Sequence, residues 1–262
     1  MTGSGQGMVG RVALVTGGTS GIGRATAEAF LRAGASVMIC GRRESPGRLA
    51  VKELDGLGDI AFRAADVTDE TSVAGLVEAT CDRFGRLDYA FNNAANTDAA
   101  RDIGTFTDMA LSEFEGIVRA SLVSVWLSMK YELPALVESG GGAVVNTSSM
   151  DARIQMAGTG SYAAAKAGCE ALTVAAAKEY ASKGVRINAV RPGAIRTPML
   201  EQNLDAKGPE GRASVEDGYR RIIAMRRLGE PGEVAEAVVW LCSDRSSYVT
   251  GHVLTVDGAL GL

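Results

Sequence analysis

Two polar residues in the second half of the chain have the types and the spacing to exchange a proton with a bound molecule. Tyr162 and Lys166 lie four residues apart in an alanine-rich segment, 161–168. Because alanine favours helix and positions i and i+4 lie on one helix face, both side chains should face one cavity. The ammonium stabilises a neighbouring phenolate, so this tyrosine could act as an acid or a base. Taken alone, the pair also fits an ordinary solvated helix face.

Ser149 is a third candidate for the same chemistry. It follows the apolar run 143–147, which we expect to form a buried strand, so its hydroxyl should emerge at the carboxyl end of that strand. Ligands bind at this end of the strands in open α/β sheets.

A glycine-rich segment near the start of the chain has the character of a phosphate-binding turn. Gly17, Gly21 and Gly23 lie between an apolar run and a helical pattern. Such glycines permit a tight turn, a close backbone approach to a pyrophosphate and close packing of the helix. The helix N-terminus then favours an anion. The spacing differs from G-x-G-x-x-G, so a glycine turn without a ligand stays open as an alternative.

The elements that must position these residues alternate along the chain, which predicts βαβ units and a parallel sheet. The chain has 262 residues and no linker, so we expect a single domain over 1–262. The predicted strands are 11–16, 36–41, 60–64, 87–92, 143–147, 185–190 and 253–256. The predicted helices are 21–33, 47–57, 69–84, 111–136, 160–182 and 231–243.

These residues resemble the motifs of the short-chain dehydrogenase/reductase family, and the resemblance extends over nearly the whole chain. In order, the matching segments are Thr16-Gly17-x-x-x-Gly21-x-Gly23, Asp66-Val67, Asn92-Asn93-Ala94-Ala95, Ser149, Tyr162-x-x-x-Lys166, Asn188-Ala189-Val190-Arg191-Pro192-Gly193, Ile195-x-Thr197-Pro198 and Asp257-Gly258. The resemblance implies an α/β fold with a doubly wound, mostly parallel seven-stranded sheet flanked by helices, which is Rossmann-like. It also implies an NAD(P)-dependent enzyme that transfers a hydride between its cofactor and a ketone or secondary alcohol.

The resemblance also implies a role for each matching residue. Tyr162 would be the catalytic acid and base, Ser149 would bind the substrate oxygen, and Lys166 would also hold the nicotinamide ribose. Adenine and the rest of the adenosine half would meet Asp66, Val67, Asn92 and Ala94, and the nicotinamide amide would meet Ile195 and Thr197. The expected cofactor-binding residues are Gly17, Thr19, Ser20, Gly21, Ile22, Gly23, Arg42, Asp66, Val67, Asn92, Ala94, Tyr162, Lys166, Pro192, Gly193, Ile195 and Thr197.

One position departs from the family pattern. The family's catalytic asparagine lies within the predicted helix 111–136, and the alignment puts Ser121 there. The asparagine helps to keep a kink and a bound water that connects the lysine to solvent. A serine can instead donate a hydrogen bond to the Ile117 carbonyl four residues earlier, or leave space for another water. We count Ser121 with the catalytic residues, on the hypothesis that it supports a modified relay.

The end of the predicted strand 36–41 bears on the choice of cofactor. An NAD enzyme usually has a carboxylate there for the ribose 2′-hydroxyl, whereas this chain has Gly41 followed by Arg42. A guanidinium can bind a 2′-phosphate through charge-assisted hydrogen bonds. Against this, Ser20 lacks the basic side chain of many NADP-binding relatives. The sequence favours NADP(H) and leaves NAD(H) open.

Composition bounds the remaining partners. The net charge of −4 gives no electrostatic reason to expect nucleic acid or an anionic membrane. The four cysteines form no C-x-x-C pair and His252 is the single histidine, so we predict no metal. With no long apolar run and no signal-peptide pattern at the start, we expect a cytoplasmic protein.

The substrate and the assembly are only loosely bounded. Segments 96–107 and 150–159 should border the pocket, and the polar, glycine-containing segment 196–225 resembles the family's flexible substrate loop. A small-molecule ketone or secondary alcohol is the expected substrate. The C-terminal segment and the small residues of 164–177 predict a homotetramer. A cofactor-binding sensor or assembly subunit with little or no catalytic activity stays open as the second function class.

Overall fold

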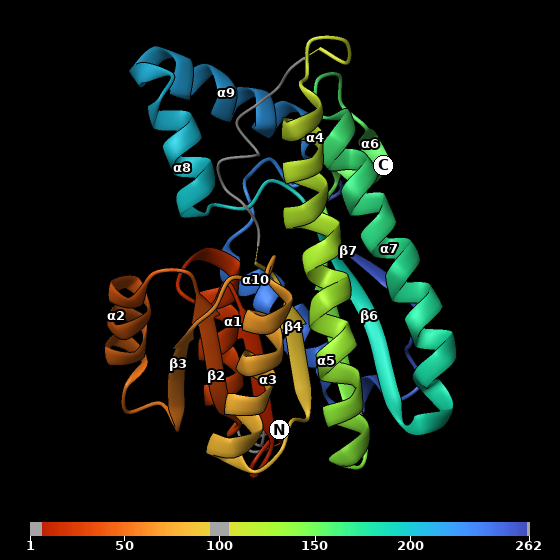
Figure 1. Cartoon of the computed structure of the whole chain (residues 1–262). Coiled ribbons are helices and arrows are strands. Elements are labelled where there is room, and N and C mark those ends of the chain that lie inside the picture. The colour runs from red at the N-terminus through yellow and green to blue at the C-terminus, as the bar shows by residue number, and fades with distance from the viewer. Residues whose placement is uncertain (1–6, 95–104, 261–262) are drawn as a thin grey trace.

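Parallel strands form one continuous sheet at the centre of the molecule (Figure 1). The computed structural model describes residues 7–94 and 105–260 of the chain. The strands are β1 Val12–Thr16, β2 Ser36–Gly41, β3 Ile60–Ala64, β4 Tyr89–Asn92, β5 Gly142–Thr147, β6 Val185–Pro192 and β7 Val253–Val256. Within the described residues their order is β3-β2-β1-β4-β5-β6-β7, so the chain winds outward in both directions from β1 and β4. This confirms the predicted doubly wound fold.

Helices cover both faces of this sheet, and each face carries its own hydrophobic core. The helices are α1 Gly21–Arg32, α2 Glu44–Leu54 and α10 Pro231–Cys242 on one face, and α3 Glu70–Phe84, α5 Ser124–Glu138 and α7 Gly160–Tyr180 on the other. Successive residues of a strand point to opposite faces. On β1, Ala13 and Val15 therefore belong to the first core and Leu14 to the second.

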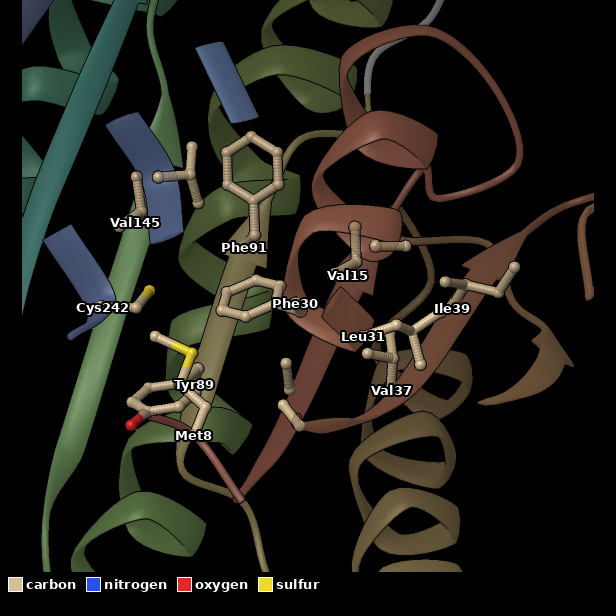
Figure 2. Close-up of a cluster of buried hydrophobic side chains, with 14 of the residues drawn as sticks. Met8, Val15, Phe30, Leu31, Val37, Ile39, Tyr89, Phe91, Val145 and Cys242 are labelled. Atoms are coloured by element: carbon tan, nitrogen blue, oxygen red, sulfur yellow. The ribbon is translucent and has the colours of Figure 1, made fainter. Parts of the chain in front are cut away.

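The first core is centred on Phe30 of α1. Its ring stacks on that of Tyr89, with 5.9 Å between the ring centroids. Figure 2 shows Phe30 among side chains from the central strands, including Val15 and Phe91. This packing fixes the C-terminal half of α1 against the sheet, while the N-terminal end of the helix follows directly on the glycine turn after β1.

The long helix predicted over 111–136 is interrupted. It consists of α4 Leu111–Val118, a π-helical turn over Arg119–Val123, and α5. In a π-helical turn the hydrogen bonds join residues five apart, and such turns occur frequently at functional sites. Ser121 lies within this turn.

The predicted substrate loop, 196–225, contains two helices, α8 Pro198–Asp205 and α9 Gly208–Ile222. Thr197 caps α8, because its Oγ1 accepts a hydrogen bond from the Leu200 N–H at 3.4 Å, and Pro198 is suited to the first turn. Figure 1 shows both helices at one end of the sheet. Their mobility stays a prediction. A short helix, α6 Asp151–Ile154, was not predicted, and residues 95–104, which include Ala95 and most of the expected border 96–107, lie outside the described residues.

Candidate active site

The turn between β1 and α1 can be built only with glycine. Gly17 and Gly21 have φ angles of +65° and +54°, in the left-handed region that side chains other than glycine rarely adopt. A Cβ on Gly23 would lie 2.2 Å from the Gly17 carbonyl oxygen, so α1 packs directly on the turn. The backbone N–H groups at the start of α1 consequently face the space above the turn without a side chain in the way.

A cavity of about 580 Å³ extends from this turn along the carboxyl ends of the strands. It is lined by Gly17, Thr19, Ser20, Gly21, Ile22, Cys40, Gly41, Arg42, Arg43, Pro46, Ala65, Asp66, Val67, Thr68, Asn93, Ala94, Gly116, Arg119, Ala120, Thr197, Pro198, Met199 and Gln202. Ten of the residues predicted to bind the cofactor are in this lining, and its size suits a ligand of dinucleotide class. A glycine cradle at a helix N-terminus fits a pyrophosphate.

The charged groups of the lining are three arginines and one aspartate. Partial burial raises the pKa of Asp66, but two hydrogen bonds from Thr68 outweigh it. Arg42 and Arg119 lower the same pKa further, so the carboxyl group is an anion and the net effect is a lowered pKa. Arg43 and Arg119 did not stand out in the sequence as cofactor-binding candidates, because arginines just beyond a strand or on a helix are usually solvated. The lining is therefore electropositive, with Asp66 as its single carboxylate among the residues that line it.

Lys166 and Tyr162 lie on α7 beside the end of β5, and Ser149 follows that strand. The Lys166 side chain is buried, with 3% of its surface exposed, and its Nζ donates a hydrogen bond to the Thr147 carbonyl at 2.7 Å. The same Nζ lies 5.7 Å from the centroid of the Tyr162 ring. Ser149 comes two residues after Thr147, and its Oγ accepts a hydrogen bond from the Asp151 N–H at 3.2 Å. The helical spacing and the end of β5 thus bring ammonium, phenol and hydroxyl to one region.

These three residues do not line the 580 Å³ cavity, and neither do Gly23, Asn92, Pro192, Gly193 and Ile195. Thr197, in the segment after β6, does line the cavity, and its Cγ2 would be 3.4 Å from a Cβ on Gly21. Ile195 is positioned nearby by a parallel bridge to Gly229, and Gly193 donates a backbone hydrogen bond to Val256 at 2.9 Å. The segment after β6 therefore connects the glycine turn to α8.

Ser121 is buried in the π-helical turn, with 3% of its surface exposed. Among the described residues no hydrogen bond joins its hydroxyl to the Ile117 carbonyl. The back-bonded hydroxyl in this region is that of Ser124, which donates to the Ala120 carbonyl at 2.8 Å. The interruption of the helix is present without asparagine, and the hydroxyl of Ser121 is left available for another partner.

The side chain of Asn92 points into a buried polar network under the cavity. Its Nδ2 donates to Glu132 Oε2 at 2.9 Å and to Asn146 Oδ1 at 3.0 Å, and Asn146 in turn donates to Thr173. Any contact of Asn92 with a cofactor would have to involve its backbone. Burial raises the pKa of Glu132 to about 7, an effect that the hydrogen bond from Asn92 only partly offsets. Glu132 did not stand out in the sequence as a functional candidate. Its signal there is that it is an acidic residue within a largely apolar helical segment.

The described residues contain no cluster of three or more histidine, cysteine or acidic side chains that could hold a metal ion. In that part of the chain no helix combines the length and the apolar character needed to cross a bilayer.

The fold, the glycine cradle and the cavity define a dinucleotide-binding α/β protein. A family model described as Enoyl-(Acyl carrier protein) reductase matches residues 17–260. A 2,5-dichloro-2,5-cyclohexadiene-1,4-diol dehydrogenase of Sphingobium indicum is 38% identical over 95% of this chain and 96% of its own length. A cyclohexanol dehydrogenase of an Acinetobacter species is 36% identical over 95% of this chain and 94% of its own.

Solved structures agree with the sequence relatives. The crystal structure of a levodione reductase superposes with a TM-score of 0.90 at 36% identity, covering 97% of this chain and 98% of that protein. The chain belongs to the short-chain dehydrogenase/reductase family, as its motifs indicated, and it is an NAD(P)-dependent enzyme.

Proposed function

We propose that this enzyme interconverts a ketone and a secondary alcohol on a small carbon ring, with NADP(H) as the preferred cofactor. The relatives support the substrate class, because two are named for ring alcohols, a cyclohexadiene-diol and cyclohexanol. The observation that carries the proposal is the buried Lys166 ammonium, which lies 5.7 Å from the centroid of the Tyr162 ring. It is next to the carboxyl end of β5, the strand that Ser149 follows.

In this proposal Tyr162 exchanges a proton with the substrate oxygen. The phenol protonates the carbonyl oxygen when a ketone is reduced, and the phenolate removes the hydroxyl proton when an alcohol is oxidised. Lys166 stabilises the phenolate with its positive charge, and the Thr147 carbonyl holds the ammonium in place. Ser149 donates a hydrogen bond to the substrate oxygen and orients it. The nicotinamide cofactor supplies or accepts the hydride when it is bound.

The preference for NADP(H) rests on the end of β2. Gly41 takes the place of a carboxylate that would repel a 2′-phosphate, and Arg42 and Arg43 line the cavity directly after it. Within the described residues neither arginine forms an ion pair closer than 4 Å, so both guanidinium groups can bind a phosphate dianion. Arg42 provides the main contact in this proposal.

The acid–base role is tested by Tyr162→Phe, with Tyr180→Phe on the same helix as the matched control. A screen of ring ketones and ring alcohols, followed through the absorbance of reduced nicotinamide, identifies a substrate. We expect Tyr162→Phe to lower kcat by about 10²- to 10⁴-fold and the control to leave it within about twofold. Full activity of Tyr162→Phe would refute the mechanism. Tight binding of NADPH with no turnover in the whole screen would favour the sensor or assembly subunit instead.

The cofactor preference has its own test. We expect kcat/KM to be higher with NADPH than with NADH. Arg42→Met should lower the ratio of kcat/KM with NADPH to kcat/KM with NADH by about tenfold, because a charge-assisted hydrogen bond to the 2′-phosphate is lost. Equal rates with both cofactors in the unsubstituted enzyme would contradict the preference and leave the acid–base mechanism intact.

A further inference from the structure

Arg119 places a third guanidinium group in the cavity, opposite the two that follow β2. It is the first residue of the π-helical turn, and it lines the cavity together with Gly116 and Ala120. Positions i, i+3 and i+4 lie on one helix face, so these three residues form one wall. The family motifs in this chain assign no role to this wall.

The Arg119 side chain reaches across the cavity to the segment after β3. Its Nη2 donates a hydrogen bond to the Thr68 carbonyl at 3.2 Å, and its charge acts on the carboxyl group of Asp66. Thr68 and Asp66 line the opposite wall. Arg119 forms no ion pair closer than 4 Å with any described residue, so its guanidinium is held by the hydrogen bond at one nitrogen. Its other N–H donors and its flat face can then contact a ligand.

Gly116 leaves space beside this guanidinium. A Cβ on Gly116 would meet no atom within 4 Å, which means that the wall is open next to Arg119. A flat ring can therefore pack on the free face of the Arg119 guanidinium, beside the Asp66–Thr68 segment, while the hydrogen bond to the Thr68 carbonyl stays in place. Arginine is suited to such a position, because its guanidinium is planar, weakly hydrated and stacks on aromatic faces. Asp66 adds an acceptor for an exocyclic amine on the ring.

We propose that Arg119 is an adenine-binding residue, with its guanidinium plane packed against the base while Asp66 accepts a hydrogen bond from the base's amino group. The proposal rests on the dinucleotide binding put forward above and adds a residue to it. Arg119 thereby contributes affinity for the adenosine half that NAD(H) and NADP(H) share, whereas Arg42 acts on the 2′-phosphate.

The test measures equilibrium binding rather than turnover. NADPH, NADH, 5′-AMP and nicotinamide mononucleotide are titrated by calorimetry into the unsubstituted enzyme, Arg119→Met and Arg119→Lys. We expect Arg119→Met to weaken NADPH, NADH and 5′-AMP by the same factor, about three- to tenfold, and to leave nicotinamide mononucleotide unchanged. Lysine can still donate to the Thr68 carbonyl but has no plane, so we expect Arg119→Lys not to restore the affinity. Arg48→Met removes an exposed arginine of α2 that lies outside the cavity lining, so it is the matched control and should leave all four ligands unchanged.

Three results would overturn the assignment of Arg119. A loss confined to NADPH would place Arg119 at the 2′-phosphate, full rescue by Arg119→Lys would show that it only fixes the segment after β3, and unchanged affinities would show that it does not touch the ligand. Should Arg119→Met melt at a lower temperature or fail to fold, Arg119→Lys decides the same question against the unsubstituted enzyme. Failure of the unsubstituted enzyme to bind either dinucleotide would instead refute the proposed function.

Discussion

Two ionisable side chains are buried near the carboxyl ends of the central strands, Lys166 on α7 and Glu132 on α5. The Lys166 ammonium has the Thr147 carbonyl as a hydrogen-bond acceptor and faces Tyr162. Glu132 has one oxygen bonded to Asn92, whereas Glu132 Oε1 and Asn92 Oδ1 are buried without a partner among the described residues. When Glu132 is protonated, its carboxyl group carries a hydrogen-bond donor, and one fewer buried oxygen is left as an acceptor without a partner. This agrees with the raised pKa of Glu132, about 7.

Glu132 predicts a pH-dependent contribution to stability. The folded-state pKa is about 7, above the ordinary value of 4.5, so the folded protein retains a proton that the unfolded chain releases. The contribution is complete below about pH 4.5, falls as the pH rises, and is lost above about pH 7. The difference between the two pKa values corresponds to roughly 3 kcal/mol. Glutamine can keep the hydrogen bond from Asn92 without ionising. We therefore expect the free energy of unfolding of Glu132→Gln, relative to the unsubstituted enzyme, to increase from pH 5 to pH 8.

Urea unfolding at several pH values between 5 and 8 measures this difference. Glu138→Gln, an exposed substitution at the end of the same helix, is the control and should show a difference that does not change with pH. A difference for Glu132→Gln that is equally flat would mean that Glu132 is ionised throughout.

At the scale of elements, the π-helical turn between α4 and α5 carries two residues for which we propose a role. Arg119 begins the turn and Ser121 lies inside it. Because the turn forms without the asparagine of the family pattern, the backbone interruption does not depend on that residue. What serine changes is the polar group at this position, a hydroxyl in place of an amide.

Ser121 is therefore expected to act through its hydroxyl. We predict that Ser121→Ala lowers kcat several-fold and shifts the pH profile of kcat, because a hydroxyl in a proton relay is lost. Ser124→Ala, which removes the hydroxyl bonded to the Ala120 carbonyl, is the control and should keep the pH profile. If Ser121→Ala and Ser121→Asn both leave turnover and its pH profile unaltered, the position is passive.

Helices α8 and α9 are joined by a network of ion pairs. Arg212 of α9 pairs with Glu201 and Asp205 of α8, and also with Glu216 on its own helix. Glu201 and Glu216 pair in turn with Arg196, just before α8. Each exposed pair contributes little, about 0.2–1 kcal/mol, but the shared partners make Arg212 a link between the two helices.

Removal of this link should loosen the end of the cavity that α8 lines. For Arg212→Met we expect faster hydrogen exchange over 198–222 and an increase of about two- to tenfold in the KM for the cofactor, which added salt would reproduce in part in the unsubstituted enzyme. Among the residues that the structure describes, Arg220 pairs only within α9, with Glu216 and Asp217, so Arg220→Met is the control. Unchanged exchange in Arg212→Met would show that packing alone holds the two helices.

At the scale of the whole molecule, apolar side chains remain exposed on the outer surface of α4 and α5. Leu111, Phe114 and Trp126 expose 71%, 42% and 46% of their surface. In addition, β7 is an edge strand of the sheet. Both regions suit association with further copies of the chain. The predicted homotetramer is thus compatible with the surface, and a cytoplasmic location stays a prediction.

Sedimentation across a dilution series tests the assembly. We expect a tetramer at micromolar concentration and, for Trp126→Glu, a smaller species, because a charge is costly to bury in an apolar interface. Lys52→Glu, a charge change at an exposed position of α2, serves as the control. A monomer at all concentrations would contradict the prediction.

Much of the fold and part of the site could be predicted from the sequence because those features are encoded locally. Glycine is required by the backbone of the β1–α1 turn, and the spacing of Tyr162 and Lys166 is a property of one helix. The strands were found because apolar runs mark strands that are buried on both faces. The segment 198–222 was missed as helix, since its polar, glycine-containing composition suggests a loop while capping by Thr197 and the ion pairs to Arg212 stabilise it.

The sequence by itself determined the alternation of strands and helices, the glycine turn and the spacing that puts Tyr162 and Lys166 on one helix, because each depends on residues close together in the chain. The doubly wound order of the strands followed from the resemblance to the family. Only the tertiary structure decided that Arg119 reaches Thr68, that Asn92 faces Glu132 instead of the cavity, and that the helix carrying Ser121 is interrupted by a π-helical turn. These features depend on how elements far apart in the chain pack, and neither composition nor spacing within one element specifies that packing.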